Sequence, residues 1–351
     1  MTNKPTSSTQ NIYFANVAKT LVIFCILLGH LPIPHDLYAF MNCYLIPFFF
    51  IISGYLLSID AIPFKKLFVK KTKTIMLPYY LFAVITFLFW YFFGRYYGDD
   101  ALQDVSPVQY ATGALLGIPS RSLLGFNLPI WFLPTLFCAE IIYYGILRFF
   151  KKRAWIVCIF CFLIGVIVKI YYPWRLPFGL DVSLFALLFF QVGRWIREGN
   201  WIEKYIANIS FVYRILLVIG FCGLTYFISQ INQANGAISM VDRIFNNYML
   251  YFISAFSGVL FILYLSYCLP ESSLFNFYGR NTIILLGFHL MVFSIIKGLQ
   301  VFVLGISLEL TEGLLWVEIL YVILTFVLLA PVIYLVNKYT PFLLGRKKGI
   351  L

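Results

Sequence analysis

The stretch Lys19–His30 reads KTLVIFCILLGH, with one basic residue, ten uncharged residues and then a histidine. The apolar character extends on both sides and covers residues 13–32. A run of about 20 apolar residues is long enough to cross the ~30 Å hydrocarbon core of a lipid bilayer. This run predicts a membrane-spanning helix that carries an ionisable group near each end. Ionisable groups inside a membrane are costly and often functional.

The composition extends this prediction to the whole chain. Hydrophobic residues make up 62% of the 351 residues and charged residues only 11%. A soluble domain of this length needs more charge to cover its surface. The sequence therefore predicts an all-α polytopic membrane protein with one membrane domain over residues 1–351. We expect about ten transmembrane helices, over residues 13–32, 38–58, 77–94, 129–149, 154–171, 182–198, 211–230, 248–268, 282–304 and 315–337.

The positive charge predicts the orientation of the chain in the membrane. The net charge is +12, and basic residues cluster between apolar runs, as in KKLFVKKTK (65–73), KKR (151–153) and GRKK (345–348). Short basic loops mark the cytoplasmic side of membrane proteins and also meet anionic lipid headgroups. We therefore expect both termini in the cytoplasm and membrane lipid as a partner. This distribution argues against a nucleic-acid partner.

The cysteines and the known short motifs indicate no permanently bound cofactor and no metal site. The seven cysteines are an odd number, and Cys158 and Cys161 form a C-x-x-C without a second ligand pair. Cysteines in apolar runs are usually small buried hydrophobic residues. No phosphate-binding glycine loop, zinc motif or serine-nucleophile motif appears.

Lys19 and His30 are predicted to face the same side of the first helix. They are eleven residues apart, close to three helical turns or about 16 Å of rise. Asn16 lies near the same face. Lys19 alone is typical of a lysine that reaches to the membrane surface, and His30 alone is compatible with helix packing. Together they favour a polar cleft in which a neutral imidazole transfers protons.

Three further polar features lie in predicted spans. His289 is either a packing residue or part of the same site. Glu140 is either in a structural ion pair or the catalytic partner of a histidine. Ser53 and Gly54 allow two helices to approach closely or line a substrate cleft.

Several segments, in this order along the chain, resemble the integral-membrane acyltransferase 3 family. The similarity is greatest to its shorter members, which are fucose 4-O-acetylase-like or surface-polysaccharide O-acetyltransferases. The segments are Lys19-x10-His30, PFFFIISGYLLS (47–58), KKTKTIMLPYY (70–80), LPIWFLPTLF (128–137), LPFGLDVSLFALLFFQVGRWIRE (176–198) and YGRNTIILLGFH (278–289). The chain departs from the pattern at Asn16, where most members are acidic, and at Lys19, where arginine is commoner.

The resemblance implies transfer of an acyl group, usually acetyl from acetyl-CoA, to a sugar hydroxyl. His30 would be the general base or an acyl carrier, with His289 and Glu140 as further catalytic residues. Clustered basic residues suit phosphate binding, so the residues expected to bind acetyl-CoA are Lys19, Lys70, Lys71, Lys73 and Arg280. The residues expected to line the substrate cleft are Ser53, Gly54, Tyr55, Asn16 and Trp131.

The resemblance further implies a multi-pass protein of the bacterial cytoplasmic membrane with a glycan or lipid-linked sugar as acceptor. The acceptor sugar, the acyl group and the side of transfer stay open, as does a homodimeric state. The alternative function is an exporter or flippase of a glycan, because aromatic residues, 20% of the chain, also suit a sugar-conducting cavity. The sequence leaves open whether His30 lies close to His289 or Glu140.

Overall fold

The computed structural model describes residues 7–57, 62–96, 105–234 and 236–346, with side chains from residue 13 onward. The chain is 82% helical, and its described residues form no β-strand. Eight helical stretches of this described part are long and apolar enough to cross a membrane. The prediction of an all-α polytopic membrane protein is therefore confirmed.

The helices match the predicted spans with a few changes of boundary. In chain order they are α1 Ser7–Leu28, α2 His35–Asn42, α3 Leu45–Leu56, α4 Phe64–Lys71, α5 Leu77–Phe92, α6 Pro107–Leu116, α7 Arg121–Leu124, α8 Phe132–Phe150, α9 Ala154–Tyr171, α10 Leu180–Glu198, α11 Phe211–Gln233, α12 Tyr248–Cys268, α13 Ser273–Arg280, α14 Thr282–Phe302 and α15 Leu315–Tyr339. One continuous stretch, Arg121–Tyr171, holds two predicted spans, α8 and α9. They are joined at Lys151–Arg153, where Lys151 has a positive φ of 47°.

Three spans differ from the sequence prediction. The first ends at Leu28, and its apolar part, Tyr13–Leu28, is shorter than the eight stretches that are long enough to cross a membrane. The second is divided into α2 and α3, which are separated at Cys43 and Tyr44. The third begins earlier than residue 77, because α4 and the π-helical segment Thr72–Met76 continue directly into α5. The lysines of α4 suggested a loop. Most of them lie on the exposed side of the helix, so forming the helix does not bury their charges. π-helical segments are rare and often occur at functional sites.

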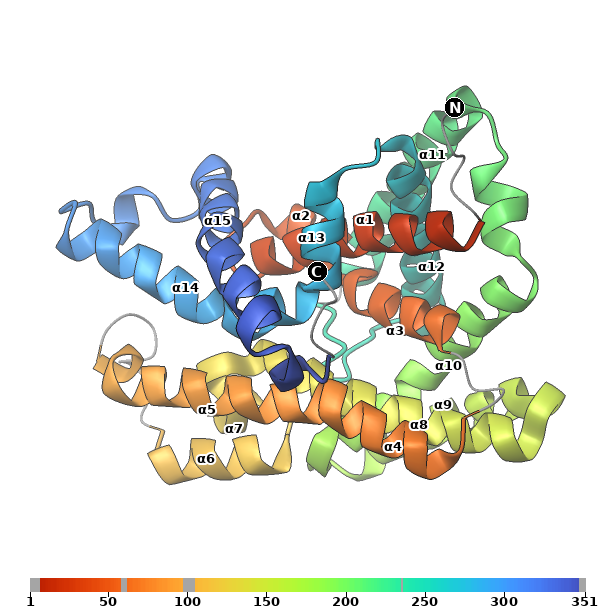
Figure 1. The fold of residues 1–351 in the computed structure, drawn as a ribbon, viewed down its shortest axis with the longest axis horizontal. Helices are drawn as coiled ribbons and strands as arrows, with labels where there is room; N and C mark the ends of the chain where they lie inside the picture. The colour runs from red at the N-terminus through yellow and green to blue at the C-terminus, as the bar shows by residue number, and fades with distance from the viewer. Residues whose placement is uncertain (1–6, 58–61, 97–104, 235, 347–351) are drawn as a thin grey trace.

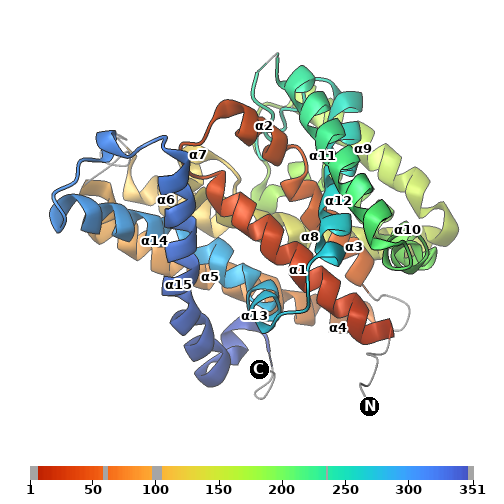
Figure 2. The same cartoon turned by 90° about the horizontal axis from the view of Figure 1, so that it is seen from above.

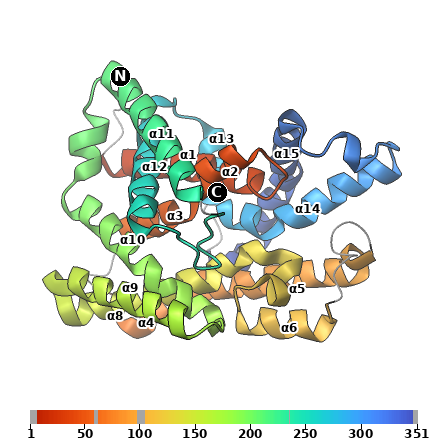
Figure 3. The same ribbon diagram turned by 180° about the vertical axis from the view of Figure 1, so that it is seen from behind.

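α1 lies across the centre of the molecule. In Figures 1 and 2, α14 and α15 lie on one side of it, and α11 and α12 lie on the other. Helices α4, α5, α6, α8 and α9 form the layer below it in Figure 1, and the view from behind in Figure 3 shows the same layer. α1 contacts α3, α12, α13, α14 and α15. Its residues therefore face several helices that are far apart in the sequence.

The short surface helix expected near residues 107–116 is present as α6. The Ser106 side chain accepts a hydrogen bond from the Gln109 N–H at the start of this helix, as N-cap residues do. Gly117 ends it with a left-handed φ of 58°, which glycine adopts without a steric penalty.

α3 and α10 approach so closely that glycine is required on both helices. A Cβ atom on Gly54 would overlap the Phe190 carbonyl, and one on Gly193 would overlap the Ile51 carbonyl. The two contacts are reciprocal, so the helix backbones touch along this line. For Gly54, the interpretation as a close-packing residue is therefore confirmed.

Replacing Gly54 with valine should destabilise the protein by about 1–3 kcal/mol, because the added methyl groups must displace the backbone of α10. The measurement is the thermal unfolding midpoint of the purified protein in detergent. Gly220→Val on α11 is the matched control, since no atom lies within 4 Å of a Cβ at Gly220. Equal midpoints for the two variants would contradict the close contact.

Candidate active site

His30 lies at a junction of three cavities. α1 ends at Leu28, and His30 follows in a turn in which its N–H donates to the Leu27 carbonyl over 3.1 Å. The ring lies deep among the helices, yet its surface is accessible, because it lines all three cavities. His30 is the one residue common to all three linings. A molecule in any of the cavities can therefore reach this imidazole.

The first of these cavities, here the Lys19 cavity, runs along α1 and has a volume of about 360 Å³. Lys19, Ile23, Ile26 and His30 line it in succession, with the spacing of one helix face. The prediction that Lys19 and His30 share a face is confirmed. The cavity connects a basic end at Lys19 with the imidazole about three helical turns away.

The basic end of the Lys19 cavity is lined by three cations, namely Lys19, Arg280 and Arg346. Within the described part of the chain, none of them forms an ion pair with a carboxylate. Clustered like charges repel one another and disfavour the empty site. An anion bound between them would remove this repulsion, so the site is suited to a phosphorylated ligand.

Arg346 was not expected in this site. Its guanidinium donates to the side-chain oxygens of Asn281 and Asn337, over 2.7 and 2.6 Å, and to the Arg280 carbonyl over 2.6 Å. Burial and the nearby charge of Arg280 lower the pKa of Arg346 from its usual value. The sequence offered only a basic cluster, GRKK, which the orientation of the chain already explained. Lys347 and Lys348 of that cluster lie outside the described residues.

Glu140 forms an ion pair with Lys71 over 2.7 Å instead of contacting either imidazole. Both residues line the Lys19 cavity. Of the two roles left open for Glu140, the ion pair is the one that the geometry supports. Lys71 lies just before the π-helical segment, which also contributes Thr74 and Ile75 to the lining. The other expected donor-binding lysines, Lys70 and Lys73, are exposed and lie outside this lining.

His289 lies beside His30, and the centroids of the two rings are 5.1 Å apart. Its side chain is fully buried in α14. Nδ1 lies 3.1 and 3.0 Å from the carbonyls of Leu285 and Leu286. Carbonyls only accept hydrogen bonds, so Nδ1 carries the proton and Nε2 is left as an acceptor. No described residue bonds to Nε2, which is buried, and His289 lies outside the lining of the three cavities, so its contact with the site is through the His30 ring.

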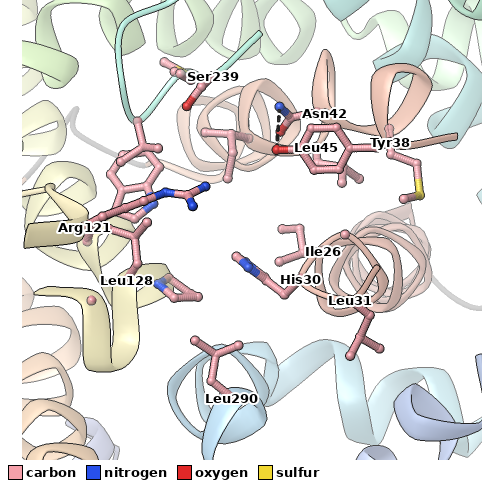
Figure 4. Close-up of a pocket in the computed structure, with 18 residues that line it drawn as sticks. Ile26, His30, Leu31, Tyr38, Asn42, Leu45, Arg121, Leu128, Ser239 and Leu290 are labelled. Carbon is pink, nitrogen blue, oxygen red and sulfur yellow. Dashed lines mark hydrogen bonds between the residues drawn. The ribbon is translucent and has the colours of Figure 1, made fainter. Parts of the chain in front are cut away.

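The second cavity, here the Arg121 cavity, has a volume of about 490 Å³. Figure 4 shows the side chains of Arg121 and His30 pointing into it from opposite sides, with Tyr38 and Asn42 on α2 nearby. Asn42 donates to the Tyr38 hydroxyl over 3.3 Å. Ser239 from the segment between α11 and α12 completes a lining with many hydrogen-bonding groups. Polar groups of this kind orient a hydroxylated ligand.

A buried ion cluster holds that segment over the Arg121 cavity. Asp181 at the start of α10 is fully buried and lies 2.8 Å from Arg175 Nε and 3.4 Å from Arg243 Nε. Asn42 also donates to the Ile238 carbonyl. The wall that carries Ser239 is therefore fixed by contacts to two helices.

The residues expected in the substrate cleft are divided by the structure. Ser53 lines the Lys19 cavity, and Trp131 lines both the Lys19 and the Arg121 cavities. Gly54 is in the close contact with α10, and Tyr55 packs edge-on against Phe14. Asn16 is buried and donates to the Asn276 side chain over 2.9 Å. The last three are outside the lining of the three cavities.

No group of three or more His, Cys, Asp or Glu side chains gathers as a metal site within the described ranges. The groups near the junction are two imidazoles, with a cluster of three cations on one side and Arg121 with neutral polar groups on another. This arrangement can hold an anionic ligand at one end and transfer a proton at the other.

A comparison with known protein families gives one match. The model of the acyltransferase 3 family, described as an acyltransferase domain, matches residues 12–338. The match covers most of the chain and includes Lys19, His30 and His289. Neither the curated proteins nor the solved structures gave a match.

Proposed function

The chain belongs to the acyltransferase 3 family of membrane acyltransferases, and on this premise we propose that it transfers an acetyl group from acetyl-CoA to a hydroxyl of a cell-surface or lipid-linked glycan. One observation carries the proposal, namely that His30 is shared by a cation-lined cavity and a polar cavity. Two ligands of different chemistry can approach this imidazole from different directions, as a transfer between two substrates requires.

The donor fits the Lys19 cavity. The phosphates of acetyl-CoA would lie at Lys19, Arg280 and Arg346, and the cavity continues along α1 toward His30. The long pantetheine arm suits this shape, because it places the thioester well away from the phosphates. The predicted cytoplasmic side of the membrane is also the side at which these cations lie, and acetyl-CoA is a cytoplasmic metabolite.

The acceptor fits the Arg121 cavity, where a sugar hydroxyl can approach His30. The imidazole takes the hydroxyl proton as the hydroxyl oxygen attacks the thioester carbonyl carbon. A carbon–oxygen ester bond forms, the carbon–sulfur bond breaks, and the proton passes from His30 to the departing sulfur. His289 packs beside His30, with the ring centroids 5.1 Å apart, and so restricts the orientation of the catalytic imidazole. An acyl-carrying role for His30 would need the same side chain at the same place.

The test is to analyse the surface glycan of the producing cells by mass spectrometry, with and without the gene for this chain. Deletion should remove acetyl groups while the amount and length of the exported polymer stay the same. Complementation with the intact chain should restore them. An unchanged acetyl content would contradict the proposal, and loss of the surface polymer itself would support an exporter instead.

A further inference from the structure

The third cavity is not used by the proposed reaction. It has a volume of about 460 Å³ and extends from His30 between α5 and α14. Its far end carries charged groups, Lys297 on α14 and Glu312 in the segment before α15. We refer to it as the Lys297 cavity.

The Lys297 and Arg121 cavities adjoin each other at His30. Both are lined by Leu31, Gly125 and Leu290 in addition to the imidazole. The Lys297 and Lys19 cavities share His30 alone. The Arg121 cavity also adjoins the Lys19 cavity, with which it shares Ile26, Ile46, Pro129, Trp131 and His30. The Arg121 and Lys297 cavities are therefore two arms of one space, which the Lys19 cavity joins at the Arg121 arm and at the imidazole. The Arg121 cavity extends to the exposed residue Arg121, and the Lys297 cavity extends to the exposed residue Glu312.

The walls of the Lys297 cavity combine aromatic rings with polar groups. Trp90, Phe126 and Phe293 supply apolar faces, and the hydroxyls of Thr86 and Ser294 lie among them. Aromatic faces pack against the C–H surface of a sugar ring, while hydroxyl and charged groups hydrogen-bond to its hydroxyls. A space that served only lipid chains would have no use for Lys297 and Glu312, because charged groups are costly against hydrocarbon.

We propose that the two arms bind one acceptor chain on both sides of the sugar that reacts, so that the acyl group is added to a sugar within an oligosaccharide or polysaccharide. This inference rests on the proposed function and specifies its acceptor. The reacting sugar lies at His30, its neighbours on one side occupy the Arg121 cavity, and those on the other side occupy the Lys297 cavity. A single sugar would fill only a part of this space.

Gly298 offers a way to block the Lys297 cavity alone. It lies on the face of α14 that lines the cavity, together with Ser294 one turn before it and Phe302 one turn after it. No atom lies within 4 Å of a Cβ at this position. A large side chain can therefore project into the cavity without displacing the protein. Gly298 is nine residues beyond His289, so the substitution leaves the two imidazoles untouched.

The experiment uses membranes that contain the full chain, radiolabelled acetyl-CoA and the surface polysaccharide of the producing cells. The polysaccharide is first freed of acetyl groups by mild base and then cut either to single sugars or to fragments of several sugars. In the wild-type protein, we expect the longer fragments to be acetylated at least about tenfold faster than single sugars. Gly298→Phe should lower the rate on the fragments by about tenfold and leave the rate on single sugars within about twofold.

Two variants control for helix effects. Gly298→Ala fills little of the cavity, and Gly220→Phe adds the same ring on α11 at a position with equally open surroundings. Both should behave as the wild type, and the KM for acetyl-CoA should be the same in all four proteins. A Gly298→Phe protein that retains the full preference for long fragments would overturn the inference. If the wild-type protein labels neither acceptor, the proposed function itself fails.

Discussion

Replacing His30 with alanine should lower kcat for acetyl transfer by about 10²–10⁴-fold, the usual contribution of a positioned general base. The KM for acetyl-CoA should change little, because the cations that would bind its phosphates are about three helical turns away. The measurement is the rate of acetyl transfer from radiolabelled acetyl-CoA in membranes, normalised to the amount of folded protein. The acetyl content of the surface glycan should fall to the level of the deletion strain.

His35→Ala is the matched control. His35 is exposed at the start of α2, and no cavity that meets at His30 includes it in its lining. This variant should retain wild-type activity. Transfer at the normal rate by His30→Ala would remove His30 from the chemistry, and the junction of the three cavities would then need another explanation.

Replacing Arg346 with glutamine should raise the KM for acetyl-CoA by about tenfold to hundredfold, the range expected for the loss of a charge-assisted hydrogen bond. Three of the five N–H donors of Arg346 are used by Asn281, Asn337 and the Arg280 carbonyl, which leaves two for a ligand. The measurement compares acetyl-CoA with S-acetylpantetheine, which lacks the phosphates. The KM for S-acetylpantetheine should be nearly the same in the variant and the wild type.

The comparison of two donors separates binding from folding. If Arg346 only stabilised the protein, its loss would affect both donors equally. Arg346→Lys keeps the charge but lacks the planar group that bonds to two asparagines and a phosphate at once. Its KM for acetyl-CoA should therefore lie between those of the wild type and Arg346→Gln. Arg148→Gln is the control, since Arg148 is an exposed arginine outside the three cavities. An unchanged KM in Arg346→Gln would exclude Arg346 from donor binding.

The membrane spans and the first polar face could be predicted from the sequence, because both depend on local spacing. Nine of the ten predicted apolar runs lie in helical stretches long enough to cross a membrane. The eleven-residue interval predicted the shared face of Lys19 and His30. The predicted helix boundaries were less accurate where charged residues lie within a helix. Because of the lysines before residue 77, the sequence did not predict that the π-helical segment Thr72–Met76 runs directly into α5.

The contacts between distant helices could not be predicted from the sequence. The pairing of His30 with His289 depends on how α14 packs against α1, which no local sequence pattern determines. The sequence left open whether His30 lies close to His289. The ion pair of Glu140 with Lys71 and the contacts of Arg346 likewise join residues that no short motif connects.

The contacts of Arg346 also have a consequence for the order in which the protein is made. Lys19 enters the membrane early in translation, whereas Arg346 and its partner Asn337 on α15 are added more than 300 residues later. At the usual rate of protein synthesis, this interval is roughly 15–65 seconds. The basic end of the Lys19 cavity is therefore completed only after α15 has been inserted. The proposed phosphorylated donor would therefore meet all three cations only after residue 346 has been added.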